Sequence, residues 1–62
     1  MQGGEMLKGP NLKAFRVLMG LTQEKFGQLA GLTQNRVSEL ERGCDPKPNE
    51  LKRLLRVISK GA

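Results

Sequence analysis

The chain has 62 residues, a net charge of +5 and a hydrophobic content of 37%, with Phe as its only aromatic residue type. That length corresponds to one small domain with a thin, aliphatic core. The chain has one cysteine and no histidine, which excludes an intrachain disulfide framework. The same composition disfavours a metal site, a cofactor, and catalysis by acid–base or nucleophilic groups.

No apolar run approaches the ~20 residues of a membrane span, so we expect no membrane partner. The lone thiol, Cys44, suits a reducing cytoplasm. The positive charge favours a polyanionic partner such as nucleic acid, although many small basic domains have other functions.

The first nine residues, MQGGEMLKG, are rich in glycine and show no periodicity. We therefore expect a flexible N-terminal tail over 1–9 and a single domain over 10–62. From Pro10, apolar residues recur with helical spacing and predict a helix of about nine residues that ends at Gly20.

The tetrapeptide Gly-Leu-Thr-Gln then occurs twice, at 20–23 and at 31–34. Threonine is a good N-cap, because its hydroxyl accepts a hydrogen bond from a free backbone N–H of the first turn. Thr22 and Thr33 are therefore predicted to begin two further helices. The glycine that opens each copy closes the preceding helix, where a left-handed residue is favoured.

These two helices, predicted over 23–30 and 34–42, are separated by a turn at Gly31 so short that they must cross steeply, as in a helix-turn-helix unit. Gly27 lies inside the first of them, where glycine costs about 1 kcal/mol relative to alanine. Either the following helix approaches too closely for a side chain, or the glycine is a tolerated accident.

The segment 43–49 is rich in turn-forming residues, and Asn49 is the predicted N-cap of a last helix that ends at Gly61. Its apolar residues follow the i, i+3, i+4, i+7 rule, and basic residues cover its other face. The expected architecture is all-α: a compact bundle of four, at most five, short helices.

The stretch LTQEKFGQLAGLTQNRVSELERG, with Arg16 before it and Pro48 and the leucine-rich helix after it, resembles the Cro/cI-type (XRE-like) helix-turn-helix family. The resemblance covers about residues 11–60 and implies a lambda-repressor-like DNA-binding fold with a central helix-turn-helix. The stretch ELKRLLRVISK also resembles the final helix of compact antitoxin-type members, which repress their own operon and bind a toxin.

On the helix predicted over 34–42, Val37 and Leu40 point to one side and polar residues to the other. Amide side chains there suit adenine, whose N6 and N7 need a donor and an acceptor side by side. The expected base contacts are Gln34, Asn35, Ser38 and Glu39. For Glu39 a second interpretation, pairing within the helix with Arg36 or Arg42, is favoured, since a carboxylate repels phosphates.

The expected phosphate contacts are Gln23, Thr33, Arg36, Arg42 and Lys47. For Gln23 the resemblance implies both a phosphate contact and a brace on the first residue of the reading helix. Glu41 lies beside the apolar stripe, where a charge should be paired. The resemblance implies Arg16 as its partner, so Arg16, Glu41, Gly27 and Gly31 are expected to be structural.

The leading hypothesis is a sequence-specific regulator of double-stranded DNA, a repressor that works as a homodimer on a near-palindromic operator in the cytoplasm, at the nucleoid. The alternative is an antitoxin or another protein-interaction module, with a toxin as its main partner. A helical bundle without DNA binding is a third possibility, and an enzyme is disfavoured.

Overall fold

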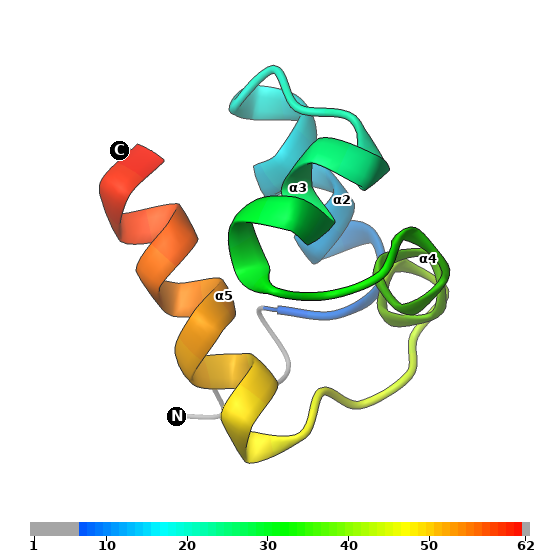
Figure 1. Cartoon of the computed structure of the whole chain (residues 1–62). Helices are drawn as coiled ribbons and strands as arrows, with labels where there is room; N and C mark the ends of the chain where they lie inside the picture. The colour runs from blue at the N-terminus through cyan, green and yellow to red at the C-terminus, as the bar shows by residue number, and fades with distance from the viewer. Residues whose placement is uncertain (1–6, 62) are drawn as a thin grey trace.

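The computed structural model describes residues 7–61 and, over that range, contains four helices and no strand. In chain order they are α2 (Gly9–Leu18), α3 (Gln23–Ala30), α4 (Gln34–Glu41) and α5 (Pro48–Gly61). As Figure 1 shows, α3 lies between α4 and α5, and it packs against both, while α2 packs against α4. The predicted compact all-α bundle is confirmed, with four helices among the described residues.

The core is aliphatic apart from one phenylalanine, as the composition predicts. Its buried side chains are Leu7, Leu12, Phe26, Ala30, Val37, Leu40, Leu54 and Val57. All four helices contribute, and the residue before each capping threonine, Leu21 or Leu32, packs against this cluster. Burial of each large side chain stabilises the fold by about 1.5–3 kcal/mol.

The folded part of the chain begins earlier than the sequence predicts. Leu7, assigned to the tail, is 2% exposed and belongs to the core, and Gly9 already begins α2. Lys8 forms an ion pair with Asp45 in the segment before α5. A single leucine in a glycine-rich stretch shows no helical periodicity, so the sequence predicts a tail that is too long. The rest of the predicted tail, residues 1–6, lies outside the described residues.

Both predicted threonine caps are present. The Oγ1 atom of Thr22 accepts from the backbone N–H of Lys25, and that of Thr33 from the N–H of Arg36, each at 3.1 Å. Gly31 closes α3 with a φ of 69°, a left-handed conformation that side chains disfavour. The repeated tetrapeptide therefore ends one helix and begins the next, as predicted.

Gly27 is required by a close approach, but not by α4 itself. A Cβ atom added there would lie 2.6 Å from the backbone carbonyl oxygen of Leu32, in the turn that leads into α4. A backbone carbonyl cannot move aside as a flexible side chain can, so only glycine allows the turn to pack this closely on α3.

The predicted N-cap of the last helix is wrong. α5 begins at Pro48, and the carbonyl of Lys47 accepts the first helical hydrogen bond, from the Leu51 N–H at 2.9 Å. Proline suits the first helical position, and the Oε1 atom of Glu50 accepts from the Lys47 N–H at 2.8 Å. This is the glutamate half of a capping box, which replaces the expected cap by Asn49.

Candidate nucleic-acid interface

The polar face predicted for the reading helix is on the surface. Gln34 and Asn35, in the first turn of α4, are exposed, whereas Val37 and Leu40 on the opposite side are fully buried. The buried pair orients the helix, since rotating α4 would expose both side chains. The two amides therefore point outward at the N-terminal end of α4, beside the exposed capping residue Thr33.

Ser38 and Glu39 lie one turn further along α4 and are half-buried. An Nη1 hydrogen of Arg36 is donated to Oε1 of Glu39 at 3.2 Å, which is the intrahelical pairing favoured above. The Glu39 side chain is nevertheless 47% exposed, and its second oxygen accepts no hydrogen bond within the described residues.

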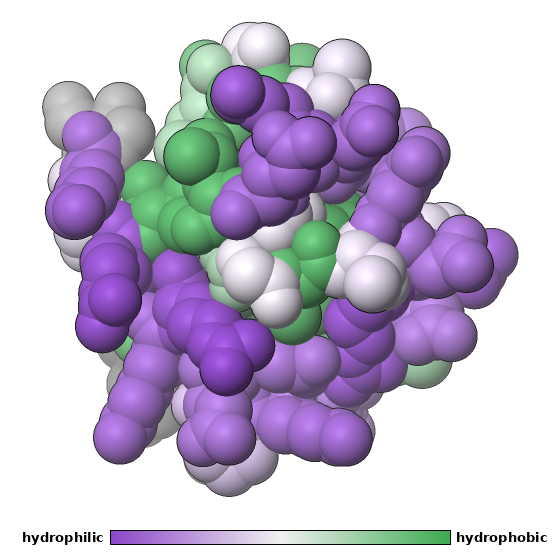
Figure 2. All heavy atoms as spheres, in the orientation of Figure 1, coloured by the Kyte–Doolittle hydropathy of each residue, from purple (hydrophilic) through white to green (hydrophobic). Residues whose placement is uncertain are grey.

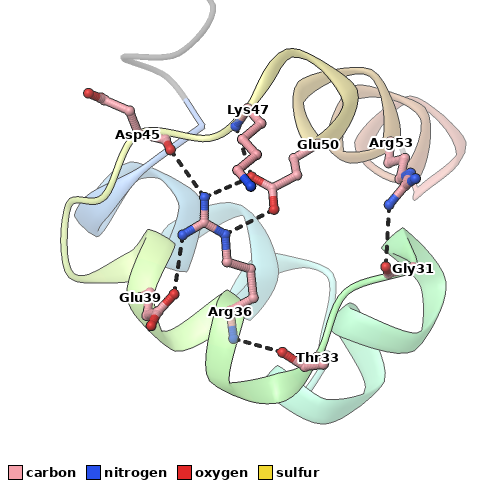
Figure 3. Close-up of polar contacts among 8 residues, drawn as sticks. All are labelled: Gly31, Thr33, Arg36, Glu39, Asp45, Lys47, Glu50 and Arg53. Atoms are coloured by element: carbon pink, nitrogen blue, oxygen red, sulfur yellow. Dashed lines mark hydrogen bonds and ion pairs between the residues drawn. The ribbon is translucent and has the colours of Figure 1, made fainter.

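Arg36 is the centre of a polar cluster that joins α4 to the beginning of α5 (Figure 3). Its Nε and Nη2 atoms donate to the two carboxylate oxygens of Glu50, each at 2.9 Å, and Nη2 also donates to the carbonyl of Asp45 at 3.3 Å. Because the guanidinium is held from two sides by carboxylates, this geometry argues against the phosphate contact expected for Arg36. These bonds link α4 to the start of α5.

The same cluster sets the charge state of Glu50, which is 9% exposed. Hydrogen bonds from Arg36, aided by the backbone N–H of Lys47, lower the pKa of Glu50 to about 2 against the opposing effect of burial. In return, the hydrogen bonds to Glu50 and Glu39 raise the pKa of Arg36. The pair is therefore ionised throughout the pH range in which the protein would work.

A second ion pair holds the other end of α4. The Nε atom of Arg16 in α2 donates to Oε2 of Glu41 at 2.6 Å, so the predicted pair is present. Arg16 also donates from Nη1 to the carbonyl of Leu21 at 2.7 Å. The amide nitrogen of Gln23 donates to Oε1 of Glu41 at 3.0 Å. Gln23 therefore contacts the last residue of α4, whereas the resemblance implied a contact with its first residue, Gln34.

The remaining expected phosphate contacts lie on the surface around α4. Thr33 is exposed at its N-terminus, Arg42 follows its last residue, and Lys47 lies in the segment that leads to α5. Within residues 7–61, neither Arg42 nor the Lys47 side chain forms an ion pair. Both cations are therefore available to an anion.

The sequence interpretation missed Glu50 as the partner of Arg36. The signal that could have found it is the spacing of Lys47, Pro48 and Glu50, which places a glutamate at the third helical position after a proline start. That spacing predicts the cap but not the arginine, which lies on another helix.

The described residues offer no helix of the length and apolarity that a bilayer crossing needs. Nor do residues 7–61 bring together three or more side chains able to ligate a metal ion.

Two short helices joined at a left-handed glycine, with an outward polar face on the second, define a helix-turn-helix protein. The model of the helix-turn-helix family matches residues 12–60, and the chain belongs to this family, in its Cro/cI-type (XRE) form. The family assigns it to the DNA-binding transcription regulators. No curated protein and no solved structure matches the chain.

Proposed function

We propose that the protein is a sequence-specific repressor that inserts α4 into the major groove of double-stranded DNA as a homodimer. The observation that carries the proposal is the exposed pair of amides, Gln34 and Asn35, on the first turn of a helix held at both ends by ion pairs. A rigid support matters because bidentate hydrogen bonds to a base require a fixed geometry.

Gln34 and Asn35 are the primary readers in this proposal, since each amide matches the N6 and N7 edge of adenine. Ser38 and Glu39 are secondary: both are half-buried, and one oxygen of Glu39 is held by Arg36. The free oxygen of Glu39 would accept from N4 of cytosine.

Phosphate contacts by Thr33, Arg42 and Lys47 would fix the register of α4 on the duplex. The N-terminus of α3 at Gln23 supplies backbone N–H groups that favour an anion. The side-chain amide of Gln23 donates one hydrogen bond to Oε1 of Glu41, so we assign its phosphate contact to the backbone and to the remaining amide hydrogen.

Two-fold pairing follows from the small size of one reading helix. A single α4 spans too few base pairs for useful discrimination, whereas a dimer places half-sites about 34 Å apart and doubles the contacts. Such binding would place the protein at the nucleoid.

The test is selection of bound sequences from a random duplex pool at two salt concentrations, followed by binding of the selected site. We expect a near-palindromic motif, and a loss of specific affinity of about 10- to 1000-fold when Gln34 and Asn35 are both replaced by alanine. Gln28→Ala removes an exposed amide from α3 and is the matched control. If the double variant keeps the preference for the selected site, the proposal is wrong.

The second candidate is an antitoxin or another protein-interaction module. Val17 and Leu18, 57% and 84% exposed on α2, favour it, since adjacent exposed aliphatic side chains often mark a contact surface. Co-expression with the product of the neighbouring reading frame would test it: a stoichiometric complex that Leu18→Ser weakens supports this candidate, and no complex contradicts it.

A further inference from the structure

A groove with an apolar floor runs between α3 and α5, away from the polar face of α4. Met19, Leu29 and Val57 line it together with two basic residues of α5, and its volume is about 320 Å³. A second hollow of about 280 Å³ shares Leu29 with it and extends the groove past Gly31. Figure 2 shows this apolar stretch between the two helices, with hydrophilic side chains on both sides.

The rim of the groove on the α5 side is basic. Arg53, Arg56 and Lys60 all line the groove, at positions i, i+3 and i+7 of the helix. At 1.5 Å per residue they span about 10 Å, which is two helical turns. Arg56 and Lys60 are exposed and form no ion pair within the described residues, and Arg53 only donates to the carbonyl of Gly31, at 3.4 Å.

We propose that this groove binds an amphipathic helix with acidic flanks, presented by a partner protein. Aliphatic side chains one turn apart on such a helix would cover Leu29 and Met19, over a floor that includes the buried Val57. Glutamates beside them would meet the cations of α5, which lie along the groove at the spacing of one helix face.

The charges favour this occupant over a second copy of the chain. Four of the acidic residues in the described part, namely Glu39, Glu41, Asp45 and Glu50, are already paired with cations. Glu24 is left as the one acidic side chain of residues 7–61 without an ion pair, on a chain of net charge +5. A second copy thus brings cations to a cationic rim.

The floor of the groove disfavours DNA as the occupant. A phosphate backbone would satisfy Arg56 and Lys60 but would leave Leu29, which is 54% exposed, without an apolar partner. The residues proposed to read bases lie on α4 and do not line the groove. Binding at the groove therefore does not depend on operator recognition, and it can occur even if α4 does not read DNA.

The test uses the full chain and a fluorescein-labelled, helix-forming peptide of about 18 residues, with leucines at i, i+4 and i+7, glutamates beside them and alanine elsewhere. Fluorescence anisotropy should show saturable binding with a dissociation constant on the order of 100 μM. A peptide with glutamine in place of every glutamate should bind at least about tenfold more weakly.

Protein variants then locate the site. Arg56→Glu combined with Lys60→Glu should weaken binding about tenfold, and Leu29→Ser about fivefold. The matched controls are Lys13→Glu, an exposed cation on α2, and Leu55→Ser, which is 51% exposed on α5 outside the groove. Neither should change the affinity by more than about twofold, and circular dichroism checks that each variant is folded.

Several results would overturn the proposal. These are no saturable binding at about 1 mM peptide, equal affinity for the glutamine peptide, or equal losses in the control variants. If binding of a random-sequence duplex depends on Arg56 and binding of the peptide does not, the basic rim is a phosphate site and not a site for an acidic helix. Self-association lost in Leu29→Ser, seen by sedimentation, would assign the groove to a second copy. The Gln34 and Asn35 alanine variant should bind the peptide normally, which separates this test from that of DNA reading.

Discussion

Both ends of α4 are held by an arginine–glutamate pair, yet the two pairs join different kinds of structure. At the C-terminal end, Glu41 meets Arg16 of α2, with side chains 5% and 12% exposed. Nearer the N-terminal end, Arg36 meets Glu50, with side chains 23% and 12% exposed.

The difference lies in what surrounds each pair. α2 and α4 also pack against each other directly, so the pair of Arg16 and Glu41 is set in a helix–helix contact. α4 and α5 share little direct packing, and Arg36 binds the carbonyl of Asp45 and, through Glu50, the cap of α5. The first pair thus lies within a helix–helix contact of the core, whereas the second links the 42–47 segment and the start of α5 to α4.

The largest effect is expected for Glu41→Ala. It leaves the guanidinium of Arg16, 12% exposed, without its carboxylate, and Gln23 without its acceptor. The free energy of unfolding should fall by about 3 kcal/mol, which lowers the melting temperature by more than about 10 °C in a domain of this size. Glu24→Ala on the exposed face of α3 is the control, and an unchanged melting temperature would contradict the role given to the pair.

A smaller loss is expected for Glu50→Gln. Glutamine keeps the volume and still accepts from the Lys47 N–H, but it removes the charge that Arg36 binds. Urea denaturation should show a loss of about 2 kcal/mol, because both partners retain some contact with water. A loss greater than that of Glu41→Ala would reverse the order of the two pairs.

The pH dependence of stability tests the pair of Arg36 and Glu50 separately. The folded-state pKa of Glu50, about 2, lies below its ordinary value of 4.5. The stabilisation is therefore fully present above about pH 4.5 and is lost as the pH falls towards 2, because protonation breaks the pair. Unfolding measured across this window should show wild type losing up to about 2 kcal/mol relative to Glu50→Gln. Parallel curves for the two proteins would show that Glu50 does not titrate as the geometry requires.

The smallest effect is expected for Glu39→Gln. This carboxylate also binds Arg36, but its side chain is 47% exposed and the pair lies within one helix. Its removal should cost no more than about 0.5 kcal/mol, and less at high salt. Thermal melts at two salt concentrations provide the measurement; a loss comparable to that of Glu50→Gln would mean that the cluster acts as one unit.

Much of the bundle could be predicted because its signals are local. The caps by Thr22 and Thr33 and the left-handed turn at Gly31 each act within a few residues of one helix end. The outward position of Gln34 and Asn35 follows from the periodicity that buries Val37 and Leu40. The pair of Arg16 and Glu41 came only from the family resemblance, since no local rule connects residues on separate helices.

The sequence by itself determined where α3 and α4 begin and which face of α4 is polar, because capping and helical periodicity are short-range effects. Only the tertiary structure decided that Leu7 belongs to the core, that Arg36 binds Glu50, and that a groove with a basic rim lies between α3 and α5. These features depend on where the chain returns after a loop, and the free energy that selects them comes from contacts between residues distant in sequence.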